Sequence, residues 1–475
     1  MHKFPFVGRS LPVTGRPLPV TGRALPFTGR SLPFAGRSLL FATFRLLLAG
    51  FSLCTLLPSA ALAEHWVVDP SGGGDFTHIQ SAIEAATPGD EIEVLAGTYA
   101  EELDYLGKDL RIFAAEGPDA TALTPPVPAN RSTHLVTFAS GEGSGASLEG
   151  FTLTASSGPL VTSLGGTGGG AIGCYGSEPQ ILGCVFLQNE ADYGGGILLI
   201  DASPTISGCA FLENLAHISG SAIAGPNSAP NILECRFEDN EAVTGSGTVQ
   251  LALPCDIVAC EFINNRAHSG GAISCPYDTA NLLIKGCTFE SNQSTVTHGG
   301  AIRIHEASPT IESCTFVDNR AALDGGAIFT VDGGSAEVRH CTFYFNLAQR
   351  SGAHLAVLNG ATPVIENCIL SEALGGYGVF VDSALPAFVC NAFWNNHPLN
   401  FLNFEDPSGT DGNFTADPLF CDVFSYDFTI DTNSPCAEEN NPSCGQIGRF
   451  GVGCGGVRCH CISWGHLRTR FDPRP

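Results

Sequence analysis

The sequence predicts an all-β protein in which short strands stack as a parallel β-solenoid. The first observation is a cysteine that recurs eight times at intervals of 25 to 27 residues. The second is composition, since 57 of the 475 residues are glycine and only 15 % are charged, which disfavours a helical protein. The third is that the repeat shows strand-like alternation and no long helical period. Such a short unit cannot bury a face by itself, so copies must stack.

The same residues recur at fixed offsets from the cysteine. In the first seven repeats, phenylalanine follows two residues later and asparagine five residues later, and a Gly-Gly-Ala-Ile unit recurs after them. The row of cysteines comprises Cys184, Cys209, Cys235, Cys260, Cys287, Cys314, Cys341 and Cys368. The row of asparagines comprises Asn189, Asn214, Asn240, Asn265, Asn292, Asn319 and Asn346. Between Ile311 and Cys314 the alternation changes phase, which predicts a bend or bulge in each repeat.

Each repeated position is expected to form a row, because stacked parallel strands place equivalent residues about 4.8 Å apart. Cysteine and phenylalanine lie two apart on a strand and should face the interior together. The buried asparagine amides should bond to one another and to the turn backbone. One cysteine per turn, without a Cys-x-x-Cys pair, does not suit zinc, so we expect reduced structural thiols and no metal.

Residues 1–63 are interpreted as a secretory signal with an unusual leader. Arg45 precedes an apolar run at 46–57, and Ala61-Leu62-Ala63 provides the small residues of a cleavage site. The run is too short to cross a bilayer comfortably, so we expect no transmembrane segment after cleavage. The upstream Gly-Arg-x-Leu-Pro units recur every seven residues. These units either come from a tandem DNA repeat that lies upstream of the true start site, or they form an unusually long N-terminal region of the signal peptide.

Residues 64–400 are expected to form the solenoid, with a helix covering its N-terminal end. Apolar residues at helical spacing precede Pro88-Gly89. These residues are Ile79, Ala82, Ile83 and Ala86. A helix here would cover the open end of the solenoid, which would otherwise template aggregation.

Two resemblances add to this prediction. The segment GDFTHIQSAIEAATPGDEIEVLAGTYAE, residues 74–101, resembles the N-terminal cap of pectin-lyase-like right-handed parallel β-helix proteins. The Phe-x-x-Asn and Gly-Gly-Ala-Ile units are similar to the repeats of chlamydial polymorphic membrane proteins, whose β-helical passengers act in adhesion. The resemblances imply a right-handed parallel β-helix over most of residues 65–400.

Residues 401–456 are expected to form a cysteine-rich C-terminal cap, and 457–475 a basic tail. Four cysteines outside the row, in an exported chain, predict two disulfides. They are Cys421, Cys436, Cys444 and Cys454. Three pairings are open, and we favour sequential pairing, Cys421 with Cys436 and Cys444 with Cys454, because it closes the shortest loops.

The charge of the chain excludes some partners. Its formal net charge is −25, and all 47 acidic residues follow residue 63. Nucleic acid and anionic membranes are therefore not expected partners. No cofactor is expected, and calcium is left open as an alternative although no motif indicates a calcium site.

One patch on the expected outer face mixes charges. Arg303 and His305 lie two apart on a strand and share a side, and Asp332 lies one repeat after His305. These three residues are the candidates for substrate binding, with Glu306, Tyr277 and Asp278 close by. The alternative, which we favour, is an ordinary solvated face. The trio could hold a uronate carboxylate and accept a proton.

The sequence favours a non-catalytic function. The sequence motifs of pectinesterases and polygalacturonases are absent. The residues expected to face outward after the Gly-Gly-Ala-Ile units are mostly apolar or small. We expect an exported bacterial scaffold, secreted or at the cell surface, that adheres to other surfaces or binds extracellular glycans. The alternative is a polysaccharide-active lyase, hydrolase or epimerase of the pectin-lyase-like type.

Overall fold

The computed structural model describes residues 63–126, 133–276 and 282–455. The predicted signal before residue 63, the basic tail at 457–475, Tyr277 and Asp278 lie outside the described residues.

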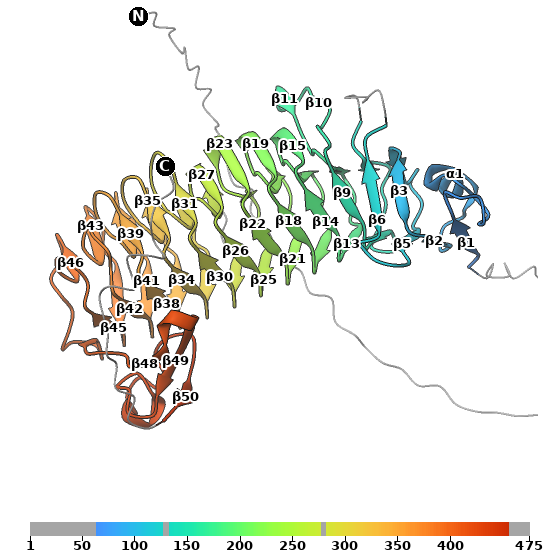
Figure 1. Ribbon diagram of the computed structural model, residues 1–475. Helices are drawn as coiled ribbons and strands as arrows, with labels where there is room; N and C mark the ends of the chain where they lie inside the picture. Colours follow the sequence, from blue (N-terminus) through green and yellow to red (C-terminus); the bar gives the residue numbers. More distant parts are fainter. Residues whose placement is uncertain (1–62, 127–132, 277–281, 456–475) are drawn as a thin grey trace, which may run out of the picture. The chain divides into compact units, whose positions relative to one another are not determined.

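The described chain is a right-handed parallel β-helix, as predicted (Figure 1). Most of its strands belong to three long parallel sheets and one shorter sheet. Sheet I has twelve strands, from β4 (Leu103–Asp104) to β46 (Phe401–Leu402). Sheets II and III have thirteen each, from β1 (His65–Val68) to β44 (Ala387–Val389) and from β3 (Gly97–Ala100) to β47 (Phe414–Thr415). Sheet IV has seven, from β15 (Glu190–Tyr193) to β39 (Leu347–Ala348).

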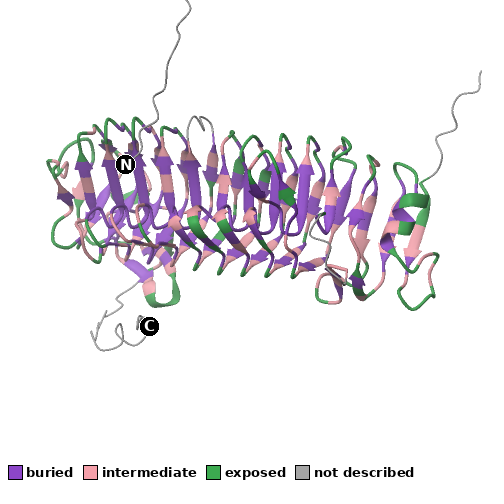
Figure 2. Cartoon of the chain, turned by 90° about the horizontal axis from the view of Figure 1, so that it is seen from above, coloured by how far each residue is buried: buried purple, intermediate pink, exposed green. Residues whose placement is uncertain are grey.

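One turn illustrates how the repeat builds these sheets. The strands of this turn are β32 (Ile302–His305), β33 (Thr310–Glu312), β34 (Thr315–Val317) and β35 (Arg320–Ala321), in sheets I to IV respectively. Ser313 has a φ of 54°, a left-handed conformation that turns the chain between β33 and β34. This is the bend predicted from the change of phase. Buried residues follow the strands, and exposed residues gather at the turns (Figure 2).

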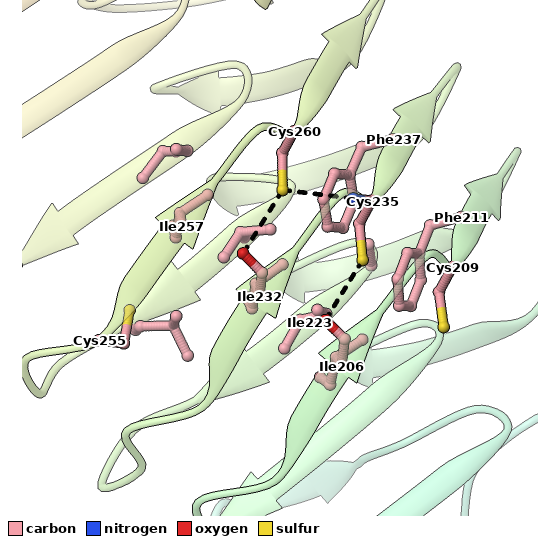
Figure 3. Close-up of a cluster of buried hydrophobic side chains, with 14 of the residues drawn as sticks. Ile206, Cys209, Phe211, Ile223, Ile232, Cys235, Phe237, Cys255, Ile257 and Cys260 are labelled. Carbon is pink, nitrogen blue, oxygen red and sulfur yellow. Dashed lines mark hydrogen bonds between the residues drawn. The ribbon is translucent and has the colours of Figure 1, made fainter. Parts of the chain in front are cut away.

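The cysteine and phenylalanine rows lie in the interior, as Figure 3 shows for Cys209, Cys235 and Cys260. All eight cysteines of the row are buried free thiols. The phenylalanine rings from Phe186 to Phe343 stack nearly parallel, with centroids 4.5 to 5.0 Å apart. Equivalent residues pair in register from turn to turn, for example Phe316 with Phe343. The rows therefore form a continuous apolar core along the solenoid axis.

The asparagine row is a chain of hydrogen bonds through the interior. Asn265 Nδ2 donates to Asn292 Oδ1 at 3.0 Å and to the Phe237 carbonyl oxygen at 2.9 Å. Its Oδ1 accepts the backbone N–H of Asn240 at 3.1 Å and the Asn240 side-chain amide at 3.0 Å. Each buried amide is thus satisfied by the turns before and after it. This pattern fixes the register of successive turns.

A buried histidine continues the row where it is interrupted. Ala373 occupies the row position after Asn346, so no asparagine is there. Asn346 Nδ2 instead donates to His354 Nδ1 at 3.2 Å, and His354 Nε2 donates to Asn396 Oδ1 at 2.9 Å. The same Asn396 oxygen accepts the Ala373 backbone N–H at 3.0 Å. The neutral imidazole therefore spans one turn of the row.

The N-terminal helix α1 (Ile79–Ala85) lies at the end of the solenoid, and Ile79, Ala82 and Ile83 are buried. Both helix ends are satisfied by distant side chains. The Glu101 carboxylate accepts the backbone N–H groups of Ile79 and Gln80 at 3.1 Å. Lys108 Nζ donates to three carbonyl oxygens at the C-terminal end. Anionic and cationic groups at these ends also suit the helix dipole.

One disulfide lies within the C-terminal cap and a second joins the cap to the solenoid, so the predicted sequential pairing is wrong. Cys421 pairs with Cys454 and Cys390 pairs with Cys444, whereas Cys436 is a buried free thiol. β48 (Phe420–Asp422) and β50 (Val452–Cys454) both pair with β49 (Asp427–Asp431). This sheet places Cys421 beside Cys454, although the chain segment between these two cysteines is long.

Cys390 lies one residue before the position of the cysteine row. Its thiol is therefore not part of the apolar core and is available to form a disulfide. In this turn Asn391 occupies the position that cysteine has in the earlier turns, and its Oδ1 accepts the Cys368 backbone N–H at 2.9 Å. Cys390 has a φ of 56°, the same left-handed conformation as Ser313. Its side chain therefore meets Cys444 of the cap outside the apolar core.

The cap also packs on the outer face of sheet III. Arg449 reaches across two turns and donates to Thr288 Oγ1 and Thr315 Oγ1, both at 2.9 Å. Its backbone N–H donates to Thr342 Oγ1 at 3.1 Å. Ile369 and Ala392 of sheet III lie in one apolar cluster with residues of the cap. The cap is therefore a continuation of the fold and not a loose appendage.

The first prediction tests the asparagine row with Asn265→Leu. The substitution leaves the Phe237 carbonyl and the Asn240 amide groups without their partners, so unfolding free energy should fall by about 1 to 3 kcal/mol or more. Urea denaturation measures this change. Asn231→Leu, at an exposed position of sheet II, is the matched control and should change stability little. Equal losses for the two variants would argue against the row.

The second prediction concerns pH and His354. Burial lowers the pKa of His354 to about 4, well below its ordinary value of about 6.5. Between these pH values only the unfolded chain binds the proton, so stability should fall as pH is lowered through this range. The shift corresponds to about 3 kcal/mol at full effect. Denaturation at several pH values should show a weaker pH dependence for His354→Gln than for the wild type, with exposed His217→Gln unchanged from the wild type.

Candidate functional site

The predicted trio lies on the outer face of sheet I. In β32 the side chains of Ile302 and Ile304 are buried in the core, whereas Arg303 and His305 alternate with them on the other face. Asp332 follows β36 (Ile328–Val331) on the next turn. These positions are set by the register, in which Arg303 pairs with Phe329.

The structure brings His305 and Asp332 together. His305 Nε2 lies 2.9 Å from Asp332 Oδ2, with the two side chains 14 % and 40 % exposed. Asp332 has a φ of 55°, and this left-handed residue directs its carboxylate toward the turn before. Asn359 Nδ2 donates to Asp332 Oδ1 at 3.2 Å and supports the carboxylate from the following turn. Arg303 lies two residues before His305, on the same face.

Three further residues belong to this face and were missed from the sequence. They are His298, Asp324 and Arg350, each of which directly precedes the glycine-containing turn before a sheet I strand. They follow one another at intervals of 26 residues and therefore form a row across three turns. This shared offset before the glycine-containing turn is a signal in the sequence, and the residues that follow the Gly-Gly-Ala-Ile unit do not reveal it.

Asp324 is the centre of this row. Its carboxylate is fully buried, and its Oδ1 accepts Arg350 Nε at 2.7 Å, while Oδ2 contacts Arg350 Nη2. Oδ2 also lies 3.2 Å from His298 Nδ1. Burial raises the pKa of Asp324, but the hydrogen bonds from His298 and Arg350 outweigh burial and hold the pKa below its ordinary value. Asp324 is therefore ionised at neutral pH.

The carboxylate orients His298. The Asp324 backbone nitrogen lies 3.3 Å from the same Nδ1, and this contact would require Nδ1 to be the acceptor. The closer carboxylate oxygen repels a nitrogen lone pair, so we assign the proton to Nδ1, which donates to Asp324. Nε2 is then the basic atom of the neutral ring. The imidazole stacks on Phe329, with ring centroids 4.2 Å apart and planes 14° from parallel.

Apolar clusters border these residues along the outer face of sheet I. Toward the N-terminus, Val161 of the hairpin β10 (Leu160–Val161) and β11 (Gly166–Thr167) packs on Leu198 and Ala224. Toward the C-terminus, Phe329 packs with Val331 and Ala356. The charged side chains adjoin the second cluster, since Phe329 stacks on His298 and is the register partner of Arg303. We name Arg303, His305, Asp332, His298, Asp324 and Arg350 the Arg303 cluster.

The described residues contain no group of three or more His, Cys, Asp or Glu side chains arranged to hold a metal ion. Within the same residues, no helix has the length and apolar character needed to traverse a bilayer. Glu306 is exposed beside the Arg303 cluster, whereas Tyr277 and Asp278 lie outside the described residues.

A family model described as a right handed beta helix region matches residues 136–289 and 255–398. No curated protein matches the sequence. The chain is similar to the catalytic domain of a GH87 α-1,3-glucanase, with 11 % identity, a TM-score of 0.41, and coverage of 74 % of this chain and 69 % of that chain.

Two other solved structures are similar at the same level. A PL6 family alginate lyase has 12 % identity and a TM-score of 0.38, over 79 % of this chain and 58 % of that chain. The A-module of a mannuronan C-5 epimerase from Azotobacter vinelandii has 13 % identity and a TM-score of 0.36, over 72 % and 94 %. Likenesses of this size carry no information about the reaction or ligand of this chain.

Proposed function

Because the chain belongs to the right-handed β-helix family, whose model spans more than half of it, we propose that its function lies on the outer face of a sheet. The protein acts as an exported, non-catalytic scaffold that adheres to surfaces by binding their glycans at sheet I. The observation that supports this proposal is the Arg303 cluster, in which two arginines and two histidines gather on an otherwise acidic chain.

The chemistry of the cluster suits glycans that carry an acidic group. The guanidinium of Arg303 is a permanent cation that can donate two parallel hydrogen bonds to a carboxylate or sulfate. Arg350 is paired with the Asp324 carboxylate, and Arg303 is the second guanidinium of the cluster. The formal net charge of −25 opposes the approach of acidic polymers to the chain as a whole, so their binding requires local cations such as the arginines of this cluster.

Two features support an extracellular location. The two disulfides of the C-terminal cap are typical of proteins that fold in an oxidising compartment. The predicted signal before residue 64 would deliver the chain to such a compartment. The similarity of the repeats to chlamydial polymorphic membrane proteins supports a role in adhesion.

A second candidate function is a polysaccharide-active enzyme. The observation that favours it is the His298–Asp324 pair, which presents a basic nitrogen on the same face as Arg303. A cation and an oriented imidazole are the groups that proton transfer on an acidic sugar requires.

One experiment separates the two candidates. The purified protein is applied to a glycan array that contains neutral, carboxylated and sulfated oligosaccharides. Each glycan that binds is then incubated with the protein and assayed for new reducing ends and unsaturated products. Binding without products supports the scaffold, and products support the enzyme. If no glycan binds and no product forms, both candidates are wrong.

The third prediction concerns Arg303→Ala. Loss of a charged hydrogen bond of about 1.5 to 3 kcal/mol should weaken binding of acidic glycans at least tenfold. Any turnover of such a glycan should fall at least about a hundredfold. Calorimetric titration and product assays measure the two effects. Arg266→Ala, an exposed arginine of sheet IV, is the matched control and should retain binding. Full affinity in the Arg303 variant would place the site elsewhere.

A further inference from the structure

Arg350 is anchored through one edge of its guanidinium. Nε and Nη2 donate to the two carboxylate oxygens of Asp324, and Nε lies 2.7 Å from Oδ1. The Asp324 side chain is fully buried, whereas the Arg350 side chain is 55 % exposed. The exposed part of Arg350 is therefore the end of the guanidinium that lies away from Asp324. In the part of the chain that the structure describes, the N–H groups of Nη1 at this end make no hydrogen bond.

Asp324 is itself fixed by the turns on both sides of it. Its Oδ2 lies 3.2 Å from His298 Nδ1 on the turn before, and both of its oxygens bind Arg350 on the turn after. A buried carboxylate is stable only when it is paired in this way, so its position is well determined. Arg350 is thus held in one orientation before a ligand arrives, and it loses little side-chain freedom when it binds one.

The exposed end of the guanidinium suits an oxyanion. Its parallel N–H groups match the two oxygens of a carboxylate, and a sulfate ester offers oxygens of the same kind. The charges of Arg350 and Asp324 are opposite, so the attraction for an anion comes from fixed hydrogen-bond donors more than from net charge. Asp382, at the end of β43 (Val379–Asp382), is a further carboxylate whose charge acts on Arg350. It is exposed, so solvent screens its charge.

We propose that Arg350 orients the acid group of a glycan bound at the Arg303 cluster, by two parallel hydrogen bonds from the end of its guanidinium, and that Asp324 positions Arg350. The proposal rests on the glycan binding proposed above and adds a residue that determines its specificity. The acid group is a uronate carboxylate or a sulfate ester. A glycan without an acid group gains nothing from this contact.

The test measures affinity by calorimetric titration at neutral pH and constant ionic strength. The probes are a sulfated galactan oligosaccharide, a polygalacturonate oligosaccharide and an uncharged galactan oligosaccharide. Arg350→Lys keeps a positive charge but loses the planar pair of donors. Its affinity for the charged probe that the wild type binds should fall at least about tenfold, and its affinity for the uncharged probe should not change. Comparison of the sulfated with the uronate probe identifies which oxyanion the site takes.

Asp324→Asn separates an oriented hydrogen bond from attraction by charge. The substitution removes a negative charge beside Arg350, so charge attraction alone would strengthen the binding of an acidic glycan. We expect the opposite, because an amide cannot accept hydrogen bonds from Nε and Nη2 through both of its terminal atoms. The guanidinium then loses its fixed orientation. Affinity for the charged probe should fall about fivefold, the cost of immobilising one long side chain.

The matched control is the pair of Arg320 and Asp318 on sheet IV. Arg320 Nε and Nη2 donate to Asp318 Oδ1 at 3.2 and 3.0 Å, and Asp318 is also buried. Arg320→Lys and Asp318→Asn should leave the affinity for every probe unchanged. Thermal melts show whether each variant is folded. Arg350→Lys, at an exposed position, provides the test if Asp324→Asn does not fold.

The outcomes separate this proposal from the proposed function. Equal affinity of the wild type and Arg350→Lys for the acidic glycan would overturn the role of Arg350 and leave the glycan site in place. An equal loss for the uncharged probe, or in the control variants, would also overturn it, because the contact would not be one between Arg350 and the acid group. Unchanged or tighter binding by Asp324→Asn would overturn the positioning role of Asp324. If the wild type binds no acidic probe, the binding site itself is wrong, and the role of Arg350 with it.

Discussion

The hydrogen bonds of the asparagine row are the constraint on which the rest of the structure depends. A strand of three or four residues has little apolar area, so burial alone does not fix which residues of neighbouring turns face one another. Each asparagine amide bonds to the next asparagine and to a backbone carbonyl of the turn before, so a slip by one residue would leave buried polar groups unsatisfied. His354 shows the strength of this constraint, because a buried imidazole spans the turn in which the asparagine is missing.

A fixed register turns every repeated position into a straight row, inside and outside. The interior rows of cysteine and phenylalanine make the core, in which each phenylalanine ring stacks on the next. The outer rows are not constrained by this ring stacking. Part of the Arg303 cluster is such an outer row, in which His298, Asp324 and Arg350 follow one another from turn to turn. A functional site can therefore be placed on this solenoid by changing outer residues alone.

The ends of the solenoid are closed by different means, because each end exposes unpaired strand edges. At the N-terminal end, α1 packs on the first strands and has both its ends satisfied by Glu101 and Lys108. The C-terminal cap is held by a disulfide from Cys390 and by Arg449, which reaches back along sheet III. The Arg303 cluster lies on sheet I, whereas the C-terminal cap packs on the outer face of sheet III.

The sequence by itself determined the repeat, the interior rows, the N-terminal helix and the parallel stacking, because these follow from local spacing. It also placed Arg303 and His305 on one outer face, since alternation along a strand is local. The tertiary structure decided which cysteines pair and that His298, Asp324 and Arg350 converge. Loop length misled the choice of pairs, because β49 brings Cys454 to Cys421 and because Cys390 lies one residue outside the interior row. The direction of a turn side chain depends on its backbone conformation and on the turns that pack against it, and spacing alone contains neither.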